Sequence, residues 1–297
     1  MKFLWTLVLA MAAALPAAAD SSSPLLAAYY DRQMAIVGGY TYAWQGIRAP
    51  RRLPMHGVQV GVGRDTHYVL SDDGKLIGFR DAPARTRTLM TGVATFAAGD
   101  SGVLAIKKDA TLWKVHGFAG EQQKIANDVV TAAIGDGANY FVTTAGDLFV
   151  RGAAHRGQYG DGELQASQKF VQTAQNVAHI SAHTGHAILL KASGDVFGTG
   201  GNIYGPVGKH GLGDKAVRWS KIAAGAIAVA TGSSHSVAIR RDATLIAWGS
   251  EYGTDPVVVL RDVTAVAAGS FTTIALRSDG SLWQWGRGRA PRRVNLK

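Results

Sequence analysis

Two nearly identical arginine-rich segments lie toward opposite ends of the 297-residue chain: Arg48-Ala49-Pro50-Arg51-Arg52-Leu53 and Arg289-Ala290-Pro291-Arg292-Arg293-Val294, with Arg287 close by. Guanidinium groups bind carboxylates and phosphates through paired hydrogen bonds, so the two segments together would attract an acidic protein or a phosphorylated glycan. No aromatic residues interleave with the arginines, which disfavours single-stranded nucleic acid as a ligand. The alternative is that both segments are edge strands whose charge discourages edge-to-edge pairing.

A second set of candidate binding residues lies in two long Gly-containing loops, 153–167 and 201–215. The set comprises His155, Arg156, Gln158, Tyr159, Asn202, Tyr204, Lys209 and His210. Loops on one sector of a rigid scaffold commonly carry binding groups. The alternative is that these loops are structural, with Asp161 and Asp214 bonding backbone amides. The sequence leaves both interpretations open.

The sequence predicts no catalytic residues, no metal and no cofactor. His179 and His183 share one face of a strand near His186, but a metal site needs a third ligand, so hydrogen-bonded histidines between sheets are favoured. Residues 232–236 lack the final Gly of a nucleophile elbow, and the chain contains no H-E-x-x-H, no P-loop and no recognisable carboxylate pair. A catalytic centre assembled from side chains of several repeats would leave no such motif in the sequence.

The elements that position these residues are seven copies of one β-hairpin. In the clearest copy, Ser278 to Gly286, Asp279-Gly280 predicts a two-residue turn between two apolar strands. The second turn position recurs through the chain at Gly39, Gly74, Ala110, Gly146, Gly194, Ala243 and Gly280. Eleven residues before it stands Gly in five copies, with Ala28 and His183 as exceptions. Such fixed offsets indicate a repeat architecture.

Each copy also has a run of small residues before its hairpin and a further β-like piece after it, which gives four short strands. Seven copies of a four-stranded sheet predict an all-β, seven-bladed β-propeller. The first copy lacks a clear opening strand, and residues 294–297 have no repeat after them. We therefore expect the C-terminal strand to pair with the N-terminal blade and close the ring.

The segment Gly157-Gln158-Tyr159-Gly160-Asp161-Gly162 resembles the G-Q-L-G-D-G pattern of the regulator of chromosome condensation repeat family, and residues 211–214 repeat part of it. His186 and His235 occupy the histidine slot of that family's longer motif. The resemblance implies a propeller over residues 34–297 and, because members of the family include a nuclear exchange factor and a secreted protein inhibitor of β-lactamases, a protein-binding role. Its motifs specify the fold and not an activity.

The N-terminal residues predict that the protein is exported from the cytosol. Lys2, the apolar run Phe3 to Leu15 and Ala17-Ala18-Ala19 fit a signal peptide over residues 1–19, with an uncleaved anchor as the alternative. Residues 20–33 form an N-terminal lead-in, and no other apolar run is long enough to cross a bilayer. The absence of Cys rules out disulfides, and the net charge is +10.

We therefore expect an exported, periplasmic or secreted, non-catalytic propeller that binds another macromolecule. A protein partner is favoured, and the arginines suit an acidic one; nucleic acid is disfavoured. One alternative is a binder of cell-envelope glycan that uses the arginine-rich segments. The other is an enzyme with its site at the mouth of the central channel.

Overall fold

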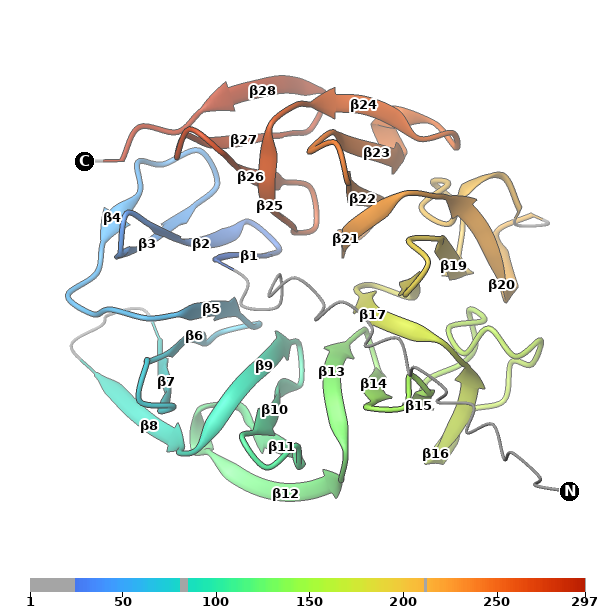
Figure 1. The fold of residues 1–297 in the computed structure, drawn as a ribbon, viewed down its shortest axis with the longest axis horizontal. Helices are drawn as coiled ribbons and strands as arrows, with labels where there is room; N and C mark the ends of the chain where they lie inside the picture. The colour runs from blue at the N-terminus through green and yellow to red at the C-terminus, as the bar shows by residue number, and fades with distance from the viewer. Residues whose placement is uncertain (1–24, 81–84, 211–212, 297) are drawn as a thin grey trace, which may run out of the picture.

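The computed structural model describes residues 25–80, 85–210 and 213–296. The expected signal peptide, the start of the lead-in and Lys297 lie outside these residues. The described chain folds into seven four-stranded antiparallel sheets arranged radially around a central axis (Figure 1). This confirms the seven-bladed propeller, and the blades are numbered 1 to 7 along the chain.

The strands of each blade follow one another from the axis to the rim. The innermost strands are β1 (Leu26–Tyr29), β5 (Gln59–Val62), β9 (Val93–Gly99), β13 (Val129–Ile134), β17 (Val177–Ala182), β21 (Ala226–Thr231) and β25 (Val263–Ala268). The second strands are β2 (Arg32–Val37), β6 (His67–Leu70), β10 (Gly102–Lys107), β14 (Ala138–Thr143), β18 (His186–Lys191), β22 (His235–Arg240) and β26 (Thr273–Arg277). The third strands are β3 (Tyr40–Gln45), β7 (Leu76–Phe79), β11 (Leu112–His116), β15 (Leu148–Gly152), β19 (Val196–Gly201), β23 (Leu245–Gly249) and β27 (Leu282–Gly286).

The outer strands complete the sheets. They are β4 (Arg51–Arg52), β8 (Thr86–Met90), β12 (Glu121–Ala126), β16 (Ser167–Ala174), β20 (Lys215–Ala223), β24 (Val257–Leu260) and β28 (Arg289–Arg293). Three short 3₁₀ turns, η1 (Gly117–Ala119), η2 (Gly208–His210) and η3 (Ser250–Tyr252), follow third strands. No helix of the described segments is long and apolar enough to cross a membrane.

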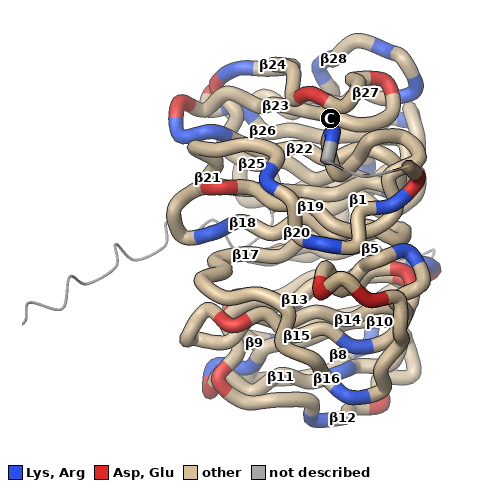
Figure 2. The backbone as a smooth tube through the Cα atoms, turned by 90° about the vertical axis from the view of Figure 1, so that its right-hand side faces the viewer, with Lys and Arg blue, Asp and Glu red and all other residues tan. Residues whose placement is uncertain are grey.

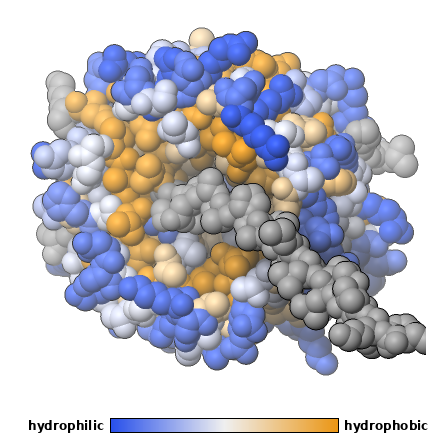
Figure 3. All heavy atoms as spheres, viewed as in Figure 1, coloured by the Kyte–Doolittle hydropathy of each residue, from blue (hydrophilic) through white to orange (hydrophobic). Residues whose placement is uncertain are grey.

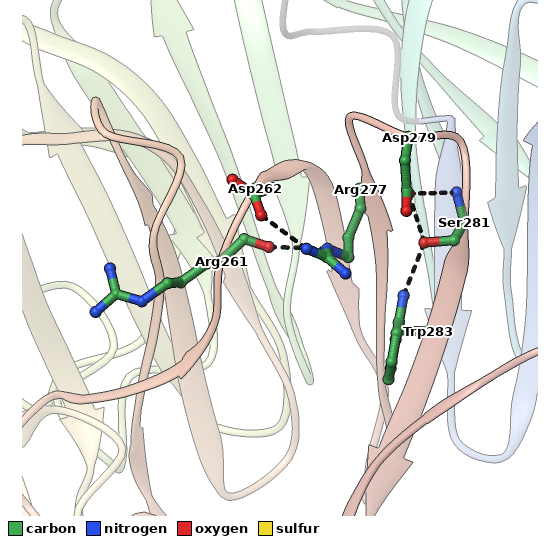
Figure 4. Close-up of polar contacts among 6 residues, drawn as sticks. All are labelled: Arg261, Asp262, Arg277, Asp279, Ser281 and Trp283. Carbon is green, nitrogen blue, oxygen red and sulfur yellow. Dashed lines mark hydrogen bonds and ion pairs between the residues drawn. The ribbon is translucent and has the colours of Figure 1, made fainter.

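The hairpin of blade 7 shows how the repeated Asp and Gly fix a turn (Figure 4). The backbone N–H of Arg277 donates to the carbonyl of Ser281 at 3.0 Å, so the connection has three residues and not the predicted two. Gly280 adopts a φ of +77°, which suits a turn that ends in a left-handed residue. The carboxylate of Asp279 accepts the Ser281 N–H at 2.9 Å, and the Trp283 indole N–H donates to the Ser281 hydroxyl at 2.8 Å.

Blade 3 repeats this arrangement with Thr in place of Ser. Asp109 accepts the Thr111 N–H at 3.0 Å, and the Trp113 indole donates to the Thr111 hydroxyl at 2.8 Å. The two-residue turn is found only in blade 1 among these hairpins, where Gly38 and Gly39 both have positive φ and Val37 pairs with Tyr40. The turn residues therefore set hairpin geometry copy by copy.

The expected pairing of the C-terminal strand with the N-terminal blade is wrong. Blade 1 contains four strands of its own because β1 comes from residues assigned to the lead-in, and β28 pairs with β27 inside blade 7. The propeller therefore includes residues 26–33 and does not begin at residue 34. The strand escaped detection for two reasons: Tyr29 stands where five other blades have Gly, and the shorter turn of blade 1 shifts the repeat spacing by one residue.

Side-chain packing closes the ring in place of a shared strand. The described residues contain seven apolar clusters, and each joins one pair of adjacent blades. The cluster between blades 7 and 1 includes Leu26, Trp44 and Ile274, and Val294 and Leu296 pack against it. At the same interface, the Trp44 indole donates to the Gln284 side-chain oxygen at 3.1 Å, and the Gln284 amide donates to the Gly46 carbonyl at 2.7 Å.

The residue distribution follows the radial plan. Apolar residues surround the centre of the ring, and hydrophilic residues occupy its periphery (Figure 3). The innermost strands carry small residues such as Ala97, Ala132, Ala182 and Ala230, and they enclose a central channel with a cavity of about 230 Å³. The channel is therefore narrow.

We predict that Gln284→Ala lowers the free energy of unfolding by about 2 kcal/mol, because it leaves the buried Trp44 N–H without an acceptor. Chemical denaturation monitored by tryptophan fluorescence measures the change. The control is Gln172→Ala, which removes an exposed hydrogen bond to Asp147 on the rim and should cost less than about 0.5 kcal/mol. Equal effects of the two substitutions would contradict the role of Gln284 in closing the ring.

Candidate functional site

One face of the ring collects the loops that could bind a partner. Because strands alternate in direction within a blade, the turns after the first and third strands emerge on the same side. Backbone hydrogen bonds confirm this: the Ala153 N–H donates to the Gly137 carbonyl, and the Gly201 N–H donates to the Gly185 carbonyl, each at 2.8 Å. We call this side the loop face.

In the first predicted binding loop, between β15 and β16, two of the predicted residues are buried and hold the loop in place. Tyr159 is 1% exposed; its hydroxyl donates to the Gly152 carbonyl at 2.9 Å and accepts the Ser167 N–H at 3.0 Å. Gln158 is also buried, and its side-chain oxygen accepts the Arg156 N–H at 2.8 Å. The structure assigns Gln158 and Tyr159 to the packing of the loop and not to contact with a ligand.

The glycines of the same loop let it lie flat on blade 5. A Cβ atom on Gly160 would stand 2.5 Å from the indole nitrogen of Trp219, and one on Gly157 would stand 2.8 Å from the Ala216 carbonyl oxygen. His155 and Arg156 remain exposed. Of the residues predicted in this loop, these two are therefore available on the loop face.

The second predicted loop, between β19 and β20, clamps blade 5 to blade 6. The carbonyl of Pro206 accepts the Trp248 indole N–H at 2.8 Å and the Ser236 hydroxyl at 2.9 Å. Asn202 is buried and holds the loop from inside through the Val207 N–H at 3.1 Å. Of the residues predicted in this loop, Asn202 therefore supports the loop from inside.

Tyr204 is the exposed aromatic residue of this loop, and its carbonyl accepts the Ser250 N–H of blade 6 at 2.5 Å. Lys209 forms a surface ion pair with Asp255 at 2.5 Å. His210 ends the short turn η2. Tyr204 and Lys209 are thus presented on a loop that is hydrogen-bonded to the next blade.

The arginine-rich segments lie on the rim of adjacent blades, as expected. β4 and β28 are the outer strands of blades 1 and 7, and Figure 2 shows basic segments along β28. The exposed side chains are Arg48, Arg51, Arg52, Arg289, Arg292 and Arg293. None of the ion pairs formed by described residues includes these six. Arg52 instead covers the ring of Tyr40, with 3.4 Å from its guanidinium carbon to the ring centroid.

The loop face also carries exposed apolar and aromatic side chains, of which the sequence patterns singled out Tyr204 alone. The set, which we call the loop crescent, consists of Ile203 and Tyr204 in blade 5, Phe271 and Arg287 in blade 7, and Tyr30 and Ile47 in blade 1. Its five uncharged members are between 51% and 73% exposed. Arg287 lies over the ring of Phe271, 5.5 Å from its centroid.

Hydrogen bonds link the loops of the crescent across four consecutive blades. Besides the bond between Tyr204 and Ser250, the Gly288 N–H of blade 7 donates to the Glu251 carboxylate of blade 6 at 2.7 Å. The Ser270 N–H of blade 7 donates to the Tyr30 carbonyl of blade 1 at 3.2 Å. These loops therefore hold the crescent residues in a fixed relation.

The sequence of blade 7 matches a known repeat family. The sequence model of the Regulator of chromosome condensation (RCC1) repeat matches residues 263–289, which span β25 to β27 of blade 7. Blade 7 therefore carries a repeat of the regulator of chromosome condensation family. A curated relative, the bifunctional serine/threonine-protein kinase/NEDD4-like E3 ubiquitin-protein ligase of Dictyostelium discoideum, is 29% identical over 144 residues. That match covers 42% of this chain and 8% of the relative's length.

Solved structures show the same fold at low sequence identity. Prp20p of Saccharomyces cerevisiae, whose structure was described with its binding properties to Gsp1p and histones, aligns with a TM-score of 0.74 at 15% identity. The alignment covers 86% of this chain and 83% of that one. The ectodomain of the receptor kinase ACR4 from Arabidopsis thaliana aligns with a TM-score of 0.61 at 15% identity, covering 93% and 98% of the two chains.

His186 hydrogen-bonds between blades, as predicted, and His235 of the next blade does the same. His186 contacts the Ser236 hydroxyl at 3.1 Å, and His235 contacts the Thr273 hydroxyl at 2.8 Å. Burial lowers the pKa of His186 to about 3 and that of His235 to about 4. Within the part of the chain that the structure describes, no group of three or more potential ligand side chains is placed to hold a metal ion.

These buried histidines predict that acid destabilises the propeller. The ordinary histidine pKa is 6.5, so between that pH and about 4 the unfolded chain binds more protons than the folded one. The free energy of unfolding should therefore fall as the pH falls through this window. His235→Thr, which introduces the residue found at the corresponding place in blades 2 and 7, should remove about 3 kcal/mol of this pH dependence.

Urea denaturation at a series of pH values between 7 and 4 measures the effect. His155→Thr is the matched control, because the His155 ring is exposed on the loop face. An unchanged pH dependence in the His235 variant would show that burial of this ring does not contribute to acid sensitivity.

Proposed function

We propose that this protein is an exported, non-catalytic propeller that binds another protein through the loop crescent. The observation that supports the proposal is the group of exposed Tyr, Phe, Ile and Arg side chains on mutually hydrogen-bonded loops of one face. Scattered exposed apolar residues are normal on protein surfaces, but aromatic residues and Arg are enriched at protein interfaces and dominate their binding energy.

The rigidity of the crescent also favours binding. Ordering flexible loops on association costs free energy, and loops that are already braced avoid much of that cost. Tyr204 is held through its backbone to blade 6, and Tyr30 through its backbone to blade 7. Their side chains can therefore insert into pockets of a partner without a large loss of backbone entropy.

Two further observations support the proposal. Prp20p, which shares the propeller fold, was described with binding properties to two kinds of protein partner. The basic and apolar pattern of residues 1–15, followed by Ala17-Ala18-Ala19, supports export of the chain with Asp20 as its first residue. The partner is then a protein of the cell envelope or of the surrounding medium.

The test uses the chain from Asp20 onward as bait against envelope and culture-medium fractions. We expect Tyr204→Ser and Phe271→Ser each to weaken binding of the captured partner by at least about tenfold, because each removes a large exposed ring from the crescent. Surface plasmon resonance on the purified partner gives the affinity. Capture of cytoplasmic proteins alone would contradict the proposed export.

The matched control is Val257→Ser with Val258→Ser on the outer strand β24. These two residues are also exposed and apolar, but they lie on the rim and not on the loop face. A partner whose affinity falls with the rim variant and not with the crescent variants would refute the crescent as the binding surface.

The distribution of charge supports a second candidate, an acidic glycan of the cell envelope. Residues 25–54 and 263–296, which form blades 1 and 7, contain nine Arg and two Asp, and these account for most of the net charge of +10. Seven of these arginines, the six named above and Arg287, are exposed on β4, β28 and the loops before them, without an ion pair among the described residues. Phosphate and carboxylate groups would find unengaged guanidinium groups there.

Ionic strength distinguishes the two candidates. A glycan held by the rim arginines should dissociate from the protein as salt is raised from 0.05 to 0.5 M, whereas an apolar protein interface should retain its partner. Arg51→Ala with Arg292→Ala should reduce glycan retention on an immobilised envelope fraction by about tenfold. Retention that is insensitive to both salt and these substitutions would exclude the glycan candidate.

A further inference from the structure

In five of the seven blades, glycine is the last residue before the first turn on the loop face, and two blades depart from this pattern. In every blade the last residue before the first turn pairs with the first residue after that turn. This residue is Gly63, Gly99, Gly135, Gly232 or Gly269 in five blades, and it is Tyr29 in blade 1 and His183 in blade 5. Glycine suits the position because the blades converge there: a Cβ on Gly269 would stand 2.8 Å from the Tyr30 carbonyl oxygen.

The two exceptional side chains meet although their blades are not neighbours. The rings of Tyr29 and His183 stack with their centroids 5.2 Å apart and an angle of 29° between their planes. The Tyr29 side chain extends toward blade 3, where its hydroxyl donates to the Asp100 carboxylate at 3.1 Å. The pair therefore spans the end of the channel, where glycine in the other five blades leaves room for it.

A second cavity adjoins the channel at this pair. It has a volume of about 150 Å³, and its walls come from the first turns of blades 1 to 5. Tyr29, Ile134 and His183 line both this cavity and the central channel. We call the second cavity the mouth pocket; the stacked pair separates it from the channel.

Two polar groups of the mouth pocket lack a partner. His183 is 7% exposed, and its Nδ1 accepts the Thr184 N–H at 2.8 Å, so the neutral ring carries its proton on Nε2. This Nε2 has no hydrogen-bond partner among the described residues. Burial lowers the pKa of His183 to about 4, which keeps the ring neutral near pH 7.

The other unengaged group is the carboxylate of Asp136, for which the described residues supply no ion pair and no side-chain hydrogen bond. Asp100 differs, because it accepts the Tyr29 hydroxyl and lies 3.6 Å from Arg64 Nε. The pocket therefore offers one carboxylate without a partner, that of Asp136, and the N–H of His183 in its wall, beside the aromatic rings of Tyr29 and Tyr30. The carboxylate of Asp100 and the guanidinium of Arg64, which pair with each other, also line it.

We propose that the mouth pocket binds a small organic ammonium compound that carries an oxygen acceptor near its amine, as amino sugars and amino acids do. The ammonium group pairs with Asp136, and the oxygen accepts the hydrogen bond from His183 Nε2. The carbon skeleton lies against Tyr29 and Tyr30. A cavity of about 150 Å³ is below the roughly 300–1,000 Å³ of pockets that hold drug-sized molecules, so the ligand is limited to a single sugar or amino acid.

Isothermal titration calorimetry on the chain from Asp20 onward tests the proposal. Glucosamine and serine are the two probes, and N-acetylglucosamine and N-acetylserine are their matched controls without an ammonium group. We expect saturable binding of at least one probe and at least tenfold weaker binding of its acetylated form. The probe that binds identifies the source of the ammonium group as an amino sugar or an amino acid. Failure of both probes, or equal binding of the acetylated forms, would overturn the proposal.

Variants locate the binding. Asp136→Asn removes the exposed anion without altering packing, and His183→Gly introduces the residue that five other blades carry; each should weaken binding at least tenfold. Asp65→Asn is the control, since Asp65 occupies a first turn but pairs with Arg80 and does not line the pocket. The crescent variants Tyr204→Ser and Phe271→Ser should bind the probe as the parent does. Binding unaffected by Asp136→Asn and His183→Gly would refute the pocket as the site.

Discussion

Packing between neighbouring blades is the constraint on which the rest of this structure depends. Each four-stranded sheet buries its apolar residues only against the next sheet, and each of the seven clusters draws on two blades. A blade without a neighbour would expose that surface to water, so the array must close on itself. Closure here needs no exchanged strand, because Trp44, Gln284 and the cluster around Leu26 make the seventh interface equivalent in kind to the other six.

The sequence was sufficient for the fold because its signals are local. Asp279-Gly280 and its counterparts mark hairpin turns, and their spacing counts the blades. The same reasoning failed at Leu26–Tyr29, where the glycine that marks an inner strand is replaced by Tyr29 and the turn at Gly38-Gly39 is one residue shorter. A pattern of fixed offsets cannot detect a strand that has lost both its marker and its spacing, although the strand packs as the others do.

The candidate site was less predictable because exposure and proximity are properties of the assembled ring. Gln158 and Tyr159 have side chains typical of binding loops, yet their own loop buries them. Phe271 and Tyr30 belong to no sequence motif, and the loops that carry them are hydrogen-bonded only because the first and last blades are neighbours. The arginine-rich segments were easier to interpret, since arginine side chains are seldom fully buried whatever the details of packing.

The repeat itself suggests where a propeller of this kind can acquire specificity. Most positions are fixed by packing or by turn geometry, so substitutions there would cost stability without creating a site. Positions at the ends of the inner strands are different, because five glycines leave room around the channel for two large side chains to extend from blades 1 and 5. Tyr29 and His183 use that room, and the long loops of blades 4 and 5 add surface on the same face. Most departures from the repeat thus gather on the loop face, while six of the seven blades keep the same three-residue hairpin turn on the opposite face.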